Sequence, residues 1–184
     1  MMKALLFFAN GFEETEAIGT LDVLLRGGVD VRTVSITDDL TVEGAHGQKV
    51  IVNTTISAVK DETVDALILP GGMPGAANLA ECETLRDMLV KHHKEGKIVS
   101  AICAAPMALA KAGLLNGVDA TCYPGFEGEL SGANCKTSGV VHSGNIITGR
   151  GPGYVFDFGL TLISALKGKS VADDVAAGLL LGGR

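Results

Sequence analysis

Tryptophan is absent from this 184-residue chain, and aromatic residues make up only 4% of it. Hydrophobic residues still account for 47%, so aliphatic side chains must fill most of the core. That hydrophobic content excludes a disordered chain. The 25 glycines follow no Gly-X-Y period, which excludes a collagen-like chain. We expect a single domain over residues 1–184.

Basic residues are also in the minority, with 15 against 21 acidic residues and a net charge of −6. Nucleic-acid binding needs clustered Lys and Arg, so no nucleic-acid partner is expected. No apolar run reaches the ~20 residues that span a bilayer, so we expect no membrane partner. The apolar run at residues 4–9 is too short for a signal peptide. These absences predict a soluble, cytoplasmic protein.

Cysteine is scarce, and its spacing matches no common metal motif. There is no Cys-x-x-Cys pair and no histidine at zinc-finger spacing, so we expect no metal site. In a reducing compartment all four side chains would remain thiols. They are Cys82, Cys103, Cys122 and Cys135.

Short apolar runs alternate with segments of helical periodicity. This alternation predicts an α/β fold, with a mainly parallel sheet and helices on both faces. We expect a capping box at Ser170 and Asp173 to start the last helix. Residues 42–52 are expected to form an antiparallel excursion, and residues 140–148 a hairpin. The expected core strands are 3–9, 29–36, 66–69, 97–101 and 145–148, and the expected helices include 13–26 and a segment ending at 167.

Three loops follow expected core strands: residues 10–12, residues 70–72 and residues 102–104. The carboxyl ends of parallel strands meet at one edge of the sheet, where ligands bind. We therefore expect the three loops to converge on one site.

Cys103 lies between an apolar strand and the start of a helix, with Ala101 and Ala105 two positions to either side. A nucleophile on such a sharp elbow needs small residues at these positions. The helix start would favour a thiolate. Backbone amides at the elbow and at Gly71-Gly72 could bind an oxyanion. An inert, buried core thiol is equally compatible with the elbow pattern alone; nothing in the sequence activates the other three thiols.

Four motifs now occur in order: Gly11-Phe12-Glu13-Glu14-Thr15-Glu16, Leu69-Pro70-Gly71-Gly72, Ala101-Ile102-Cys103-Ala104-Ala105-Pro106 and Gly149-Arg150-Gly151-Pro152-Gly153. Together they closely resemble the ThiJ/PfpI superfamily, and within it the parkinsonism-associated deglycase branch, over essentially the whole chain. The resemblance implies a flavodoxin-like (Rossmann-like) three-layer sandwich.

The resemblance also assigns residues. Cys103 matches the nucleophile of the family, Glu16 its partner acid, and Gly72 and Ala104 the positions whose amides form the oxyanion pocket. It further implies a homodimer in which the first helix, with Asp22 and Arg26, makes the contacts between subunits.

Glu16 has two interpretations: a surface acid at a helix N-terminus, or a carboxyl buried beside sulfur that shares one proton with it. The resemblance favours the second.

The chain departs from related patterns at three positions. Some branches place a histidine directly after the cysteine, and here Ala104 stands there. Tyr123 replaces a later histidine of the deglycase branch; tyrosine is a poor base at neutral pH, which leaves Glu16 as the acid/base. His46 aligns with a basic residue that approaches the site, and a simple loop histidine is an equal interpretation.

Two functions share this pocket. The resemblance implies a cofactor-independent glyoxalase or deglycase of the hydro-lyase or hydrolase class, acting on small reactive dicarbonyls or their adducts. The alternative is a redox-responsive stress sensor or chaperone-like protein using Cys103, because a reactive thiolate oxidises readily. A third label, thiazole monophosphate biosynthesis, belongs to the family name, and no residue here indicates a phosphate or thiazole site.

Overall fold

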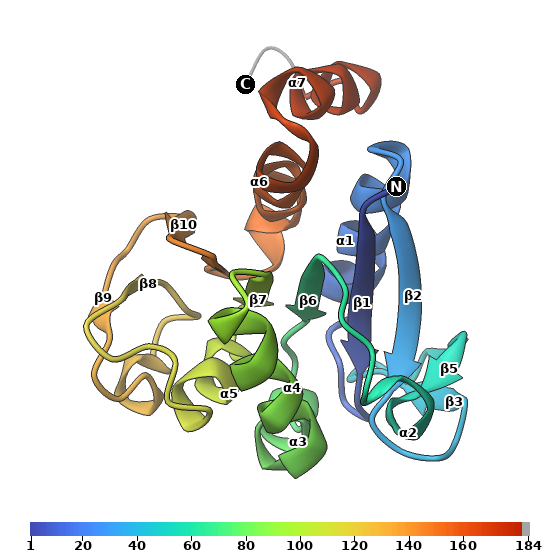
Figure 1. Cartoon of the computed structure of the whole chain (residues 1–184), viewed down its shortest axis with the longest axis vertical. Helices are drawn as coiled ribbons and strands as arrows, with labels where there is room; N and C mark the ends of the chain where they lie inside the picture. The colour runs from blue at the N-terminus through green and yellow to red at the C-terminus, as the bar shows by residue number, and fades with distance from the viewer. Residues whose placement is uncertain (182–184) are drawn as a thin grey trace.

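The computed structural model describes residues 1–181, so the last three residues of the predicted domain lie outside it. Seven strands form one sheet in the order β10-β11-β7-β6-β1-β2-β5 (Figure 1). Every neighbouring pair is parallel except β10–β11. The strands of this sheet are β1 (Lys3–Phe8), β2 (Asp30–Ser35), β5 (Thr54–Thr55), β6 (Ala66–Leu69), β7 (Ile98–Ile102), β10 (Val140–Ser143) and β11 (Ile146–Gly149).

Two short ribbons lie outside this sheet. β3 (Thr41–Glu43) and β4 (Lys49–Ile51) pair in antiparallel fashion, as predicted for residues 42–52. β8 (Asp119–Ala120) and β9 (Asn134–Cys135) form a parallel pair that the sequence did not predict. The hairpin expected at residues 140–148 is confirmed as β10 and β11, and β11 pairs with β7.

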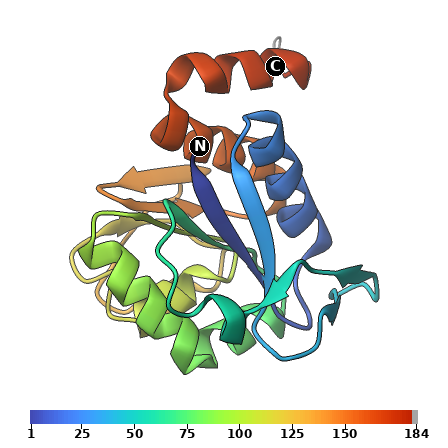
Figure 2. The ribbon, with the colours of Figure 1, turned by 45° about the vertical axis from the view of Figure 1, so that its right-hand side comes forward.

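Helices cover both faces of the sheet (Figure 2). One apolar cluster joins the sheet to α2 (Ile56–Val59), α3 (Gly75–Glu81), α4 (Glu83–Lys94) and α5 (Pro106–Lys111). The other joins it to α1 (Glu14–Arg26), α6 (Val155–Lys167) and α7 (Lys169–Gly178). Two 3-10 turns, η1 (Glu127–Glu129) and η2 (Pro152–Tyr154), complete the elements. The predicted three-layer α/β architecture is confirmed, and the order β2-β1-β6-β7-β11 is that of flavodoxin-like sheets.

The predicted start of the last helix is wrong. Gly168, with φ of 97°, is the N-cap of α7, and no side chain caps this end. Asp173 instead accepts hydrogen bonds from Lys169, one turn earlier on the same helix. A glycine in the left-handed region already ends α6, and the chain turns directly into α7 from there. The predicted Ser170 cap therefore lies inside the helix.

No helix within residues 1–181 combines the length and the apolar character needed to cross a membrane.

His92 is buried on the inner face of α4, where both ring nitrogens have partners. Its Nδ1 lies 2.8 Å from the carbonyl oxygen of Met88, and the backbone N–H of Val64 donates to its Nε2 at 3.2 Å. The ring is thus neutral, with its proton on Nδ1. Burial lowers the pKa of His92 below its ordinary value.

A lowered pKa in the folded state means that stability is lost as pH falls below the unfolded pKa of about 6.5. Between pH 7 and pH 5 we therefore expect the protein to lose stability, because the unfolded chain takes up a proton at His92 that the buried ring does not accept. Thermal melts of wild type and His92→Gln at the two pH values test this, because glutamine cannot titrate. The difference between pH values should shrink in His92→Gln and persist in His93→Gln. An equal difference in His92→Gln and wild type would contradict the assignment.

Candidate functional site

The three predicted loops converge beyond the carboxyl ends of β1, β6 and β7. The backbone N–H of Glu13 donates to the carbonyl oxygen of Gly71 at 2.9 Å, which joins the first two loops. A Cβ placed on Gly71 would lie 2.6 Å from Cβ of Cys103, so the third loop touches the second. The expected convergence is confirmed.

Cys103 stands on a strained turn. Its φ is 65°, in the left-handed region that non-glycine residues rarely occupy. The turn is held from both sides: the N–H of Cys103 donates to the carbonyl oxygen of Gly149 at 2.9 Å, and its own carbonyl accepts from the N–H of Tyr123 at 2.8 Å. The predicted elbow geometry is therefore present, and two flanking segments over-determine it.

Glu16 is completely buried on α1 and faces the cysteine. Its Oε2 accepts a hydrogen bond from the N–H of Gly71 at 2.8 Å. Its Oε1 is buried, and no group in residues 1–181 donates to it with good geometry. Between the two interpretations of Glu16, the structure selects the buried carboxyl.

Glu13 holds the start of α1 in place. As N-cap it accepts the N–H of Glu16 through its side chain, at 2.7 Å. The sequence indicated Glu13 only as a member of the Gly11–Glu16 motif and as the first residue of the expected helix 13–26, and did not reveal this role. It also missed the carbonyl of Gly149, although that glycine opens the Gly-Arg-Gly-Pro-Gly motif. The hydrogen-bond partners of Gly149 depend on which strand neighbours β7, which local pattern does not reveal.

The acid and the thiol strongly affect one another. Burial raises the pKa of Glu16 to about 7, against hydrogen bonds from Cys103 and Gly71 that lower it. Burial, followed by the charge and hydrogen bonding of Glu16, raises the pKa of Cys103 to about 12, while the backbone N–H groups of Gly72 and Ala104 lower it. The expectation that the elbow lowers the thiol pKa is therefore wrong while Glu16 is ionised: α5 is short and does not outweigh burial beside an anion.

Between these two pKa values the pair holds one proton. When that proton sits on Glu16, the charge that opposes a thiolate disappears and the carboxyl becomes a hydrogen-bond donor to sulfur. The arrangement can thus move a single proton between carboxyl, sulfur and any bound molecule.

Gly72 and Ala104 supply the amide groups nearest the sulfur, as expected for an anion pocket. Gly72 has φ of 89°, and a Cβ there would lie 2.3 Å from the backbone nitrogen of Glu13, so only glycine fits. Gly71 separates Cys103 from Glu16, and a Cβ there would lie 2.6 Å from Oε2 of Glu16.

Tyr123 reaches the site through its backbone N–H, and its ring is half exposed beside Gly151. His46 is not brought to the cysteine. It lies at the exposed turn between β3 and β4, and its Nδ1 is 2.7 Å from Oε2 of Glu14. Among the described residues it forms no hydrogen bond or ion pair with Cys103 or Glu16. Its proposed contact with substrate stays a prediction.

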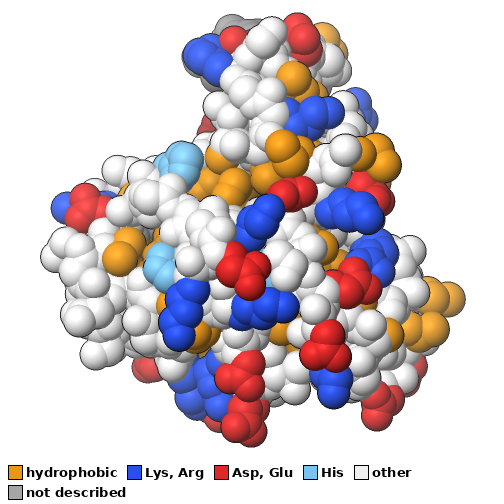
Figure 3. Space-filling view, in the orientation of Figure 1, with side chains coloured by type: hydrophobic (Ala, Val, Ile, Leu, Met, Phe, Trp, Pro, Cys, Tyr) orange, Lys and Arg blue, Asp and Glu red, His pale blue; other side chains and the backbone are white. Residues whose placement is uncertain are grey.

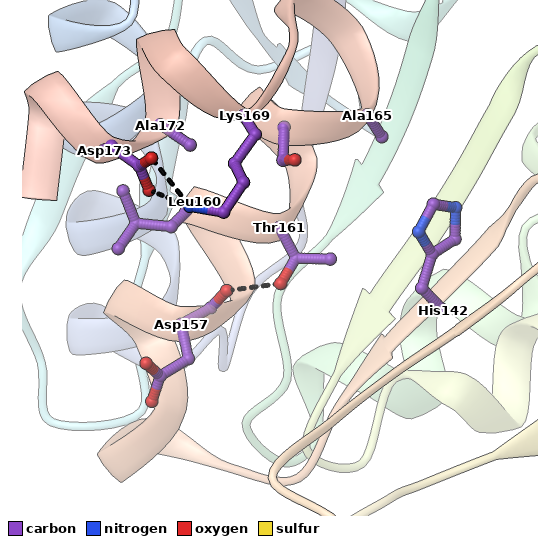
Figure 4. A pocket seen from close by; sticks show the side chains of 9 residues that line it. His142, Asp157, Leu160, Thr161, Ala165, Lys169, Ala172 and Asp173 are labelled. Atoms are coloured by element: carbon purple, nitrogen blue, oxygen red, sulfur yellow. Dashed lines mark hydrogen bonds and ion pairs between the residues drawn. The ribbon is translucent and has the colours of Figure 1, made fainter.

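A separate hollow lies between β10 and the α6–α7 pair, visible in the space-filling view (Figure 3). Lys169 bonds to Asp173 on one side of it, and His142 stands on the other (Figure 4). None of the predicted site residues lines it.

Comparison with known proteins supplies the family. The model of the DJ-1/PfpI family matches residues 2–165. Protein DJ-1 homolog A of Arabidopsis thaliana is 42% identical over 177 residues, covering 94% of this chain, and the chain spans only 45% of that relative's length. The glutathione-independent glyoxalase DJR-1.2 of Caenorhabditis elegans is 33% identical over 171 residues, covering 92% of this chain and 90% of the relative.

Among solved structures, oxidized DJ-1 of Toxoplasma gondii superposes with a TM-score of 0.94 at 38% identity, covering 98% of each chain. The match of the family model over most of the chain agrees with this structural likeness. The chain therefore belongs to the DJ-1/PfpI family.

Proposed function

We propose that this protein is a cofactor-independent glyoxalase or deglycase that acts on small dicarbonyls or their adducts. One observation carries the proposal: a buried carboxyl with a pKa of about 7 faces a cysteine on a strained elbow. General acid–base groups work best with a pKa near the operating pH. The glyoxalase name of the Caenorhabditis relative supports the same reaction class.

With methylglyoxal as substrate, the sulfur of Cys103 adds to the aldehyde carbon and forms a hemithioacetal. Glu16 then takes the proton from that carbon, and a proton is delivered to the neighbouring carbon, which had carried the ketone. The aldehyde carbon is oxidised as the ketone carbon is reduced, so the product is a lactoyl thioester. Water hydrolyses it to lactate and frees the thiol. Because the redox change is internal, proton transfer alone balances the reaction.

The backbone amides give this sequence its electrostatic support. Addition of sulfur to a carbonyl places negative charge on oxygen, and N–H groups fixed in a buried site stabilise such charge well. Gly72 and Ala104 present their N–H groups next to sulfur. Their positions are set by backbone packing, so they need no reorganisation during the reaction.

Lactate formation from methylglyoxal tests the proposal. Wild type should produce lactate catalytically at low enzyme concentration, and Cys103→Ser should lose at least about 100-fold, because serine is a far weaker nucleophile without a dedicated base. Cys82→Ser is the matched control and should retain activity, since Cys82 lies at the N-cap of α4, outside this site. Equal turnover by Cys103→Ser and wild type would refute the proposal.

A redox-responsive role is the second candidate. The observation that favours it is the amide pair at sulfur, which could also bind the oxygens of a sulfinate. The similar Toxoplasma structure is of an oxidized protein. Under this alternative, peroxide would add two oxygen atoms to Cys103, and methylglyoxal would not be turned over. The lactate assay therefore separates the two functions.

We also propose that the protein is a homodimer through α1. Ile18 and Leu25 are 42% and 52% exposed on α1, and Ile51 on β4 is 81% exposed beside them, across one apolar groove. Asp22 and Arg26 pair with each other on the exposed side of α1. Exposed apolar side chains gathered on one face are typical of an interface.

Ile51→Lys is expected to dissociate this dimer, because a charge would be buried without a partner. Light scattering at micromolar concentration should show a dimer for wild type and a monomer for Ile51→Lys. Leu180→Lys, at an 87% exposed position outside the groove, should remain dimeric. A wild-type monomer would rule the dimer out.

A further inference from the structure

Cys135 lies on the β8–β9 ribbon, on the left of Figure 1, and Cys122 lies two residues beyond the end of β8. Cys135 on β9 is paired directly with Ala120 on β8, and the N–H of Lys136 donates to the carbonyl oxygen of Ala120 at 2.7 Å. Cys122 follows Ala120 by two residues, and both belong to the same buried apolar cluster. β8 ends at Ala120, so Cys122 lies just beyond the ribbon, two positions out of register with Cys135.

The two thiols also share a neighbour. The sulfur of Cys135 lies 3.9 Å from the carbonyl oxygen of Glu127. Burial raises the pKa of Cys122 to about 11, and the charges of Glu127 and Cys135 add to the rise. Cys122 therefore lies near both Glu127 and Cys135. Cys122 is buried and Cys135 is exposed, so the two differ in access to solvent.

We propose that Cys122 and Cys135 are a second oxidation site, which hydrogen peroxide converts to an intramolecular disulfide. The exposed sulfur of Cys135 attacks one peroxide oxygen, giving a sulfenic acid and one water. The sulfur of Cys122 then attacks the sulfur of Cys135, an S–S bond forms, and the S–O bond breaks to release a second water. The two thiols lose two electrons and two protons, and peroxide is reduced to two water molecules.

The bond requires a small movement. Neighbouring strands lie about 4.8 Å apart with a rise of about 3.3 Å per residue, so positions two residues out of register place Cα atoms about 8 Å apart, and a disulfide needs about 4.4–6.8 Å. β9 has two residues, both exposed, and belongs to a ribbon outside the main sheet. It can approach β8 by about an ångström without disturbing the core.

The disulfide would form next to the elbow that carries Cys103. Tyr123 directly follows Cys122, and its N–H holds the carbonyl of Cys103. A disulfide between Cys122 and Cys135 would join β9 covalently to the residue that precedes Tyr123, and so to the hydrogen bond that Tyr123 donates to Cys103. Unlike a sulfinate on Cys103, it would be reversed by a thiol reductant.

Peptide mapping after peroxide treatment of the whole protein tests the proposal. Residues 112–136 form one tryptic peptide that contains both cysteines, with Glu127 and Glu129 between them. After iodoacetamide treatment in denaturant, we expect this peptide to carry no alkyl group and to lack two hydrogens. Cleavage after the glutamates should leave the two halves joined until dithiothreitol separates them.

Matched variants complete the test. Cys135→Ser changes an exposed side chain and should abolish the joined halves, whereas Cys82→Ser should leave them unchanged. Halves that separate without reductant, with Cys122 alkylated and Cys135 over-oxidised or bonded to another chain, would overturn the proposal. Because the readout is covalent mass, it is independent of methylglyoxal turnover.

Discussion

Glu16→Gln is expected to lose turnover of methylglyoxal by about 100-fold or more, the scale on which general acid–base groups contribute. Glutamine has nearly the same shape and can accept the N–H of Gly71 as Oε2 does at 2.8 Å. It cannot exchange a proton in the neutral pH range. Cys103 should remain open to alkylation in this variant, because no carboxylate charge opposes its ionisation.

The stability of the same variant provides an independent check. The pKa of Glu16 is raised from 4.5 to about 7 in the folded protein. A carboxyl with a raised pKa favours the folded state at low pH and loses that advantage as pH rises through the interval from 4.5 to 7. Above pH 7 the ionised carboxyl costs up to about 3 kcal/mol, which a neutral glutamine avoids. Glu16→Gln should therefore melt no lower than wild type at pH 8.

Glu14→Gln is the matched control, since Glu14 lies in the same helical turn but pairs with the exposed His46. It should retain turnover. If Glu16→Gln turned over methylglyoxal as wild type does, Glu16 would not be the proton carrier, and the redox-responsive function would gain support.

Gly71→Ala is expected to remove activity as fully as loss of the nucleophile does. Its new Cβ would meet Cβ of Cys103 and Oε2 of Glu16, each at 2.6 Å, and the carbonyl oxygen of Ile102 at 3.0 Å. Two of these neighbours belong to the reacting pair, and the third is backbone. The added methyl must therefore push acid and sulfur apart. A displacement near 1 Å in such a site costs about 100-fold in rate.

The measurement is turnover beside a thermal melt, with Gly128→Ala as control. A Cβ added at Gly128 would meet no atom within 4 Å, and its φ is not left-handed, so alanine should be accepted there without loss. Gly71→Ala should also show slower alkylation of Cys103, because the access and surroundings of sulfur change. Wild-type turnover in Gly71→Ala would show that Cys103 and Glu16 do not act together.

The sequence predicted the parts of the site that depend on local pattern. The apolar runs before Gly11, Pro70 and Cys103 indicated three parallel strands, and topology then required the loops after them to meet. Ala101 and Ala105 indicated the elbow, because such a sharp turn leaves room only for small side chains at these two positions. The burial of Glu16 came from the family resemblance rather than from its own surroundings in the chain.

Other features depend on neighbours that no local pattern reveals. Cys82, whose ψ of 104° separates α3 from α4, is the N-cap of α4. The Ser170 cap was wrong because Gly168, two residues before the predicted cap, turns the chain directly into α7. The pKa of Cys103 was misjudged because burial, together with the adjacent carboxyl of Glu16, outweighs a short helix. Each outcome is set by contacts across the fold.

The backbone at Cys103 has a consequence for how this position evolves. A residue with a Cβ pays about 1–2 kcal/mol to occupy the left-handed region, whereas glycine occupies it freely. Cys103 has φ of 65°, so glycine would relax the turn. Selection for stability alone would favour glycine at position 103, and the thiol would be lost. A cysteine is therefore retained at position 103 only where selection acts on its chemistry. Relatives with cysteine at this position keep the function of the thiol, whereas relatives with glycine there keep only the fold.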